Sequence, residues 1–141
     1  MPILQVKISP PQHPDTYARL AESLSRLTAQ HLGKQFDVTA VDIEERLVGR
    51  WYIGGELPQA ATFFLDISIT AGTNTEADKA QFIAAVYANV QQQIGGGKPL
   101  AQASYIAVHE VPATDWGYGG QTQQARRLAR TAQAQAALQA K

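Results

Sequence analysis

The sequence predicts an α+β fold in which two tandem β-α-β units form one four-stranded sheet with both helices on one face. Three observations predict it. Four short segments alternate apolar and polar residues, as strands do, and two longer segments carry apolar residues at the 3.6-residue spacing of an amphipathic helix. The order of strand, helix, strand and glycine-rich segment also occurs twice: Gly33-Lys34 recurs as Gly97-Lys98, and Trp51 recurs as Trp116.

Composition excludes several classes of protein. The chain has 141 residues, with 12 basic and 12 acidic side chains and no cysteine. A net charge of zero gives no basic surface for nucleic acid or for a membrane. Disulfides and thiol chemistry are excluded, and three scattered histidines do not indicate a structural metal site. Since no apolar run reaches the roughly 20 residues of a membrane span, and residues 1–20 do not resemble a signal peptide, we expect a cytoplasmic protein.

The first half contains each element of the pattern once. Residues 3–8 alternate and predict a strand, and the prolines of 9–14 then require a loop. Residues 15–32 have helical spacing, with Gly33 as the stop signal. Residues 37–47 alternate again and predict a second strand. Two aromatics between glycines in 49–56 indicate a hairpin or arm.

The second half repeats this order. We expect a strand over 63–69, a turn, a helix that ends at Gly95-Gly96-Gly97, a strand over 104–111 and a second glycine arm over 115–120. Thr75 followed by Asp78 indicates a capping box at the helix start. The predicted division is therefore one domain with a first half over 1–60, a second half over 61–123 and a helical tail over 124–141.

The crossover helices determine how the strands pair. Two strands joined by a helix are expected to run parallel, and both helices then cover the same face of the sheet. With only two long helices, the other face needs a cover, so we expect an oligomer in which a neighbouring subunit supplies it.

Pro2 is the candidate catalytic residue. Removal of the initiator methionine would leave its ring nitrogen as a free secondary amine at the start of a strand, in a fixed position. Such an amine loses basicity when its charged form is desolvated or lies near other cations. It is then neutral at working pH and can accept a proton from a substrate. The alternative is that proline is simply a common second residue.

The proline before a strand, the two β-α-β halves and the arms Gly49 to Glu56 and Asp115 to Gly120 together resemble the tautomerase superfamily. The likeness extends to about Gln123, and the fused repeat resembles 4-oxalocrotonate tautomerase-like members, similar in length to cis-3-chloroacrylic acid dehalogenase. It implies a homotrimer, no cofactor, and keto–enol or related proton transfer on small 2-oxo acids at Pro2.

The resemblance also implies substrate-binding residues. Trp116, or its repeat counterpart Trp51, matches an aromatic that keeps the proline pocket apolar. Lys34 and Tyr105 match substrate-contacting positions, with a solvated lysine and a packed tyrosine as the alternatives. The family's two arginines are missing from their expected positions. One of the corresponding positions is Asn74, and Arg50 in the first arm is the candidate replacement.

One cation and several aromatics favour a monocarboxylic 2-oxo acid as substrate of a tautomerase. Two alternatives stay open. One is a Pro2-dependent hydratase, decarboxylase or dehalogenase acting on small unsaturated acids. The other is a trimeric binding protein of the same fold without catalysis.

Overall fold

The computed structural model describes residues 2–140, and its first half forms a β-α-β unit. Strand β1 (Ile3–Ser9) leads into helix α1 (Pro14–Leu32), and strand β2 (Ala40–Glu45) follows. The helix stops as predicted at Gly33, which adopts φ 66° and donates its N–H to the carbonyl of Ala29 at 3.0 Å. Glycine reaches this left-handed conformation without steric cost, so the chain can turn there.

The second half repeats the unit with strand β3 (Thr62–Thr70), helix α2 (Glu76–Ile94) and strand β4 (Tyr105–Val111). The predicted capping box is present: Thr75 accepts from the N–H of Asp78, and the Asp78 carboxylate accepts from the N–H of Thr75. Two of the unpaired N–H groups at the start of α2 are satisfied in this way.

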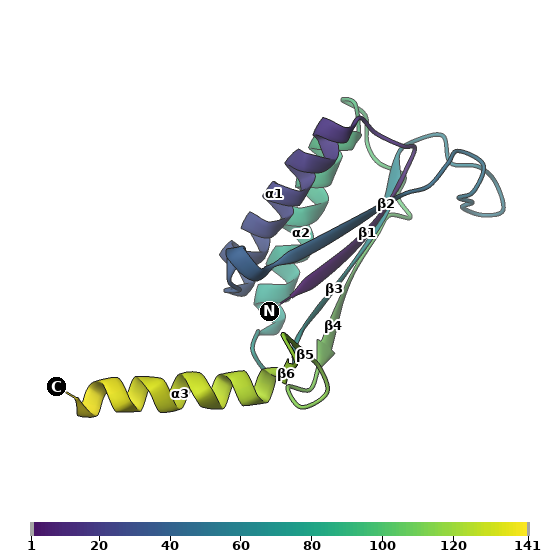
Figure 1. The fold of residues 1–141 in the computed structure, drawn as a ribbon. Helices are drawn as coiled ribbons and strands as arrows, with labels where there is room; N and C mark the ends of the chain where they lie inside the picture. The colour runs from purple at the N-terminus through teal and green to yellow at the C-terminus, as the bar shows by residue number, and fades with distance from the viewer. Residues whose placement is uncertain (1, 141) are drawn as a thin grey trace.

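The four long strands form one sheet in the order β2-β1-β3-β4 (Figure 1). The pairs β1–β2 and β3–β4 are parallel, and the central pair β1–β3 is antiparallel. Both α1 and α2 lie on the same side of the sheet, side by side (Figure 1). The α+β prediction with two helices on one face is therefore confirmed.

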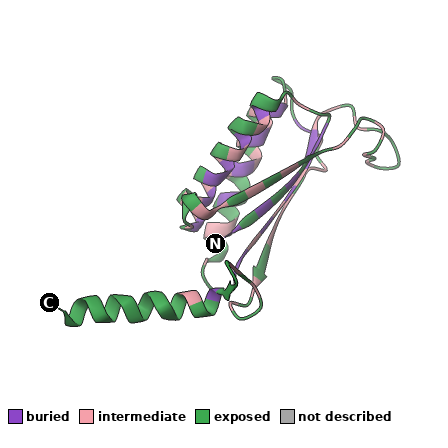
Figure 2. Cartoon of the chain, viewed as in Figure 1, coloured by how far each residue is buried: buried purple, intermediate pink, exposed green. Residues whose placement is uncertain are grey.

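The core lies between this sheet and the two helices. Figure 2 shows buried residues along the central strands and on the helix faces turned toward them. The core consists of alternate residues of β1 and β3, the inner stripes of α1 and α2, and Leu100: Leu4, Val6, Ile8, Leu20, Leu24, Leu32, Phe63, Leu65, Ile67, Ile69, Phe82, Val86, Val90, Ile94 and Leu100. The period-two and period-3.6 patterns thus mark the buried faces correctly.

Strand β2 is shorter than the predicted 37–47. A short 3₁₀ helix, η1 (Phe36–Val38), takes its first residues, and Thr39 closes that turn by donating its N–H to the Phe36 carbonyl and its hydroxyl to the Gln35 carbonyl. Alternation alone does not show this, because a side-chain hydroxyl that bonds to a local carbonyl competes with strand pairing.

Each half ends in a glycine turn. In the first, Ile53 and Glu56 form an isolated bridge around Gly54-Gly55. In the second, β5 (Gly117–Tyr118) and β6 (Gln121–Thr122) pair around Gly119-Gly120. The two pairs of glycines have nearly the same φ values, 61° and 80° against 61° and 79°, which favours the tight hairpin turns that need φ above zero at both positions.

Helix α3 (Gln123–Gln139) follows the second hairpin and extends away from the two layers (Figure 1). It begins at the end of the sheet where β1 starts, and most of its residues are exposed (Figure 2). No helix within residues 2–140 combines the length and hydropathy needed to cross a bilayer.

Candidate active site

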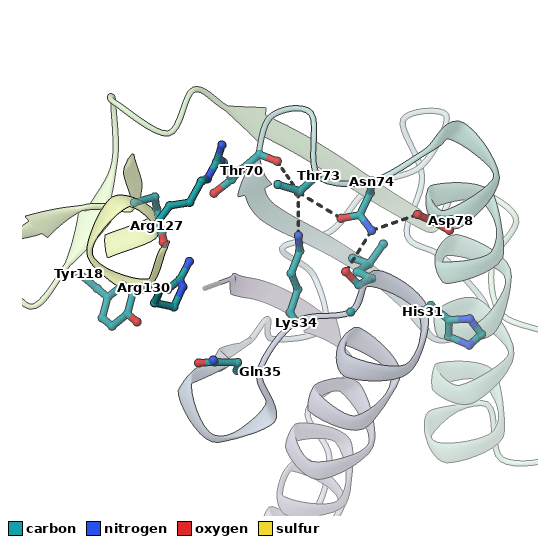
Figure 3. A pocket seen from close by; sticks show the side chains of 13 residues that line it. His31, Lys34, Gln35, Thr70, Thr73, Asn74, Asp78, Tyr118, Arg127 and Arg130 are labelled. Atoms are coloured by element: carbon teal, nitrogen blue, oxygen red, sulfur yellow. Dashed lines mark hydrogen bonds between the residues drawn. The ribbon is translucent and has the colours of Figure 1, made fainter. Parts of the chain in front are cut away.

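The pocket lined by two of the six predicted site residues, Lys34 and Asn74, lies at the end of the sheet where β3 finishes. Its volume is about 640 Å³. Side chains from the α1 end, the β3–α2 turn, the second hairpin and α3 converge on it (Figure 3). The lining residues are His31, Leu32, Gly33, Lys34, Gln35, Thr70, Thr73, Asn74, Asp78, Tyr118, Gln123, Arg127 and Arg130.

Lys34 is in the pocket because the helix stop at Gly33 turns the chain toward β3. Its Nζ donates to the hydroxyl of Thr73 at 2.7 Å (Figure 3). Burial of the ammonium lowers the pKa of Lys34 from its usual value, and the nearby carboxylates of Asp78 and Glu110 partly oppose this change. An ammonium has three N–H donors, so two remain to bind an anion.

Asn74 is also in the pocket, but its amide hydrogens have protein partners. Nδ2 donates to the Leu32 carbonyl at 3.0 Å and to the Asp78 carboxylate at 3.2 Å. The side chain therefore joins the C-terminus of α1 to the N-terminus of α2. This arrangement makes Asn74 a positioning residue for the wall that contains Lys34.

Trp116 lies behind the pocket wall. Its indole Nε1 donates to the hydroxyl of Thr70 at 3.3 Å, and Thr70 lines the pocket. The contact is made within one chain. The second glycine arm therefore reaches the pocket of its own subunit, with Tyr118 of β5 in the lining.

Pro2 is buried and lies at the same end of the sheet. Its carbonyl accepts from the N–H of Ala40 at 3.2 Å, which fixes it between the starts of β1 and β2. The antiparallel register pairs Ile3 with Ser68, so the residue before Ile3 is directed toward the end of β3 and Thr70. Met1, whose removal the Pro2 hypothesis requires, lies outside the described residues.

The internal repeat relates the first pocket to a second one. The two halves can be aligned on the first residue pair of each parallel strand pair, so that Ile3 and Ala40 of the first half correspond to Phe64 and Tyr105 of the second. This alignment matches Thr70 with Ser9, and Ser9 lines a second pocket of about 300 Å³ at the other end of the sheet. Residues 57–61, which lead into β3, also line the second pocket. By the same relation Pro2 matches Phe63, and neither residue is among those that line the pocket of its half.

Four of the six predicted residues do not line this pocket within one chain: Pro2 and Trp116, described above, and Tyr105 and Arg50. Tyr105 begins β4, whereas the pocket is near its end, and the side chain is 61% exposed on the sheet face away from the helices. Arg50 is exposed in the first arm beside Trp51, and Trp51 lines the second pocket.

The sequence analysis missed two arginines. Arg127 and Arg130 of α3 extend into the pocket from the side opposite Lys34 (Figure 3). The analysis treated this segment as a tail, although Gln123, Arg127 and Arg130 are four and then three residues apart and share one helix face. The pocket therefore contains three cations where the sequence analysis counted one.

Comparison with solved structures identifies the class of fold. A wild-type fused 4-OT that forms an asymmetric trimer matches 88% of this chain and 98% of its own, at 25% identity and a TM-score of 0.77. Pt0534 inactivated by 2-oxo-3-pentynoate matches over the same shares of the two chains, at 18% identity and a TM-score of 0.77.

A macrophage migration inhibitory factor-like protein from Entamoeba histolytica covers 86% of this chain and 97% of its own, at 18% identity and a TM-score of 0.69. The chain has the tautomerase-superfamily fold. Within that fold it is similar to the fused 4-OT structures, which include symmetric as well as asymmetric trimers. No family model and no curated protein matches the sequence.

Proposed function

We propose that this protein is a cofactor-independent tautomerase that uses Pro2 as the general base for keto–enol proton transfer on a small 2-oxo acid. The observation that carries the proposal is the buried position of Pro2 at the start of β1, at the sheet end that holds the Lys34 pocket. Burial disfavours the charged form of an amine, and the neutral form is the one that accepts a proton.

The reaction needs only one group that both accepts and returns a proton. The neutral ring nitrogen of Pro2 takes the enol O–H proton, and the resulting ammonium delivers a proton to C3 as the carbonyl forms. Lys34 pairs with the substrate carboxylate and holds C3 within reach of the nitrogen. Its partial burial strengthens this pairing because less water competes with the anion.

The proposal includes a homotrimer. One sheet face has no helix over it, and the side chains of Ile3 and Tyr105 are 41% and 61% exposed there. Large apolar side chains on an open sheet face are typical of an interface. The trimeric state of the similar fused 4-OT structures supports the same assembly for this chain.

The test is ketonisation of the enol of phenylpyruvate, followed by loss of its ultraviolet absorbance. Three proteins are compared: wild type with Met1 removed, Pro2→Ala with Met1 removed, and wild type with Met1 retained, each verified by intact mass. We expect activity only in the first. In the third, the amide bond to Met1 takes the lone pair of the Pro2 nitrogen, so the base is lost.

Equal rates for the first two proteins would rule out Pro2 as the base. Turnover of unsaturated acids without turnover of enols would instead support the hydratase, decarboxylase or dehalogenase alternative. Anion binding with no turnover of any substrate would support a non-catalytic binding protein.

A further inference from the structure

We propose that helix α3 is a substrate-binding element, and that Arg127 and Arg130 bind a second anionic group of the substrate, distant from the reacting carbons. The inference rests on the proposed function because it specifies the substrate class for the same pocket. It assigns a 2-oxo acid with two anionic groups rather than a monocarboxylic acid.

The side chains of Arg127 and Arg130 point into the pocket (Figure 3). Gln123, Arg127 and Arg130 lie on one face of α3, and all three line the pocket. Figure 3 shows Arg127 beside Thr70 and Arg130 lower on the same wall, with Lys34 across the cavity. A ligand held by Lys34 at one end would therefore meet the arginines at its other end.

Helix α3 is fixed where it meets the pocket. The N–H of Gln123 donates to the Trp116 carbonyl at 2.9 Å, and the N–H of Gln124 donates to the Ala113 carbonyl at 3.0 Å. Arg126 donates from Nε and a terminal nitrogen to the Tyr118 carbonyl at 3.1 and 3.0 Å. Its guanidinium also lies 3.8 Å from the centroid of the Tyr118 ring.

Arg126 is thus a positioning residue. Its bonds to Tyr118 hold the first turn of α3 against the second hairpin. A guanidinium that both donates to a carbonyl and stacks on an aromatic ring cannot be fully replaced by a neutral side chain.

The described lining of the pocket carries a net positive charge. Among the lining residues within 2–140, three cations (Lys34, Arg127 and Arg130) face one carboxylate, Asp78, which leaves two net positive charges. Asp78 already accepts from the N–H of Thr75 and from Asn74. In the part of the chain that the structure describes, no carboxylate lies within ion-pair distance of either arginine.

A planar guanidinium matches the two oxygens of a carboxylate or phosphate, so two unpaired arginines in a pocket wall favour an anionic ligand. The volume of about 640 Å³ has room for a chain of several carbons between the two charged ends.

The experiment measures binding by calorimetry of two probes of equal chain length, 2-oxoadipate with two carboxylates and 2-oxohexanoate with one. It uses mature wild type, the double variant Arg127→Gln/Arg130→Gln, and Arg19→Gln/Arg26→Gln as the matched control on α1. Each measurement is repeated in a Pro2→Ala background. Binding of the diacid therefore tests this inference whether or not Pro2 is the base.

We expect wild type to bind the diacid at least tenfold more tightly than the monoacid. The α3 double variant loses that preference, with diacid affinity falling about tenfold or more, because charge-assisted hydrogen bonds are lost. Its monoacid affinity, and both affinities of the control, change less than threefold. Arg126→Gln lowers diacid affinity, and Arg126→Lys restores part of it.

Equal affinity of wild type for the two probes overturns the inference. So does an equal loss of affinity for both probes in the α3 variant. The side chains of Arg19, Arg26, Arg127 and Arg130 are exposed, whereas that of Arg126 is half-buried. The double variants are therefore expected to fold, and thermal unfolding checks this. If the glutamine variant has an altered melting temperature, Arg127→Lys/Arg130→Lys keeps the charge and is expected to retain the preference.

Discussion

Replacing Lys34 by glutamine tests the carboxylate-binding role against a control from the same chain. Lys98 is the repeat counterpart of Lys34 and lines the second pocket, where the chain continues into β3 and no free amine can occur. The two substitutions remove the same charge from equivalent turns. Only the first turn lies at the end of the sheet where β1 starts.

The expected magnitude follows from the contact that is lost. Nζ of Lys34 has one protein acceptor, Thr73, and two free donors for a carboxylate. A hydrogen bond to a charged group contributes about 1.5–3 kcal/mol, and each 1.36 kcal/mol is about tenfold. Lys34→Gln is therefore expected to lower kcat/KM for enol ketonisation by about 10- to 100-fold, while Lys98→Gln changes it less than about twofold.

A pH series adds a second readout. The pKa of Lys34 is lowered by burial, so the ammonium loses its proton before an ordinary lysine at 10.5 does. KM of the wild type is expected to rise with pH below that value, and the glutamine variant is expected to lack this rise. Equal effects of the two substitutions on kcat/KM, or a rise in KM that persists in Lys34→Gln, would refute the role of Lys34.

Two further predictions concern stability and assembly. The pKa of Asp78 is lowered chiefly by its hydrogen bond from the Thr75 N–H, so its contribution to stability is present above about pH 4 and is lost as the pH falls through the lowered value. Asp78→Asn is therefore expected to be less stable than wild type in urea at pH 6, with a difference that shrinks at pH 3; a constant difference would contradict this. Tyr105→Asp places a charge on the open sheet face and is expected to convert the trimer into monomers. Ile83→Asp on α2 is the control and is expected to leave the trimer intact. Sedimentation velocity measures both. A trimer in both variants would remove that face as the interface.

Periodic segments were predictable because burial leaves a repeating signal in the sequence. The alternation of β1 and β3 and the helical stripes of α1 and α2 correspond to the observed core. The glycine stop at Gly33 and the capping box at Thr75 have local causes, so they too could be located from a few residues. The turn that brings Lys34 to the pocket follows from that glycine stop.

The position of α3 could not be predicted in the same way. Its direction depends on a contact between Arg126 and Tyr118 and on two backbone hydrogen bonds to the second arm, none of which has a periodic signature. The polar spacing of Gln123, Arg127 and Arg130 indicates a shared face but not what that face meets. Tyr105 was proposed from the family resemblance, and within one chain the parallel pairing of β3 with β4 places it at the far end of the sheet from the pocket.

The Pro2 nitrogen is proposed to be neutral and to react with small 2-oxo acids as a nucleophile and base. The most direct measurement is labelling by 2-oxo-3-pentynoate, the compound that inactivates the structurally similar Pt0534, followed by peptide mass mapping across pH 5–9. The account predicts one label per chain, on Pro2, that forms rapidly at pH 7 and eliminates activity. Labelling confined to lysines, or labelling of Pro2 that leaves activity unchanged, would contradict it.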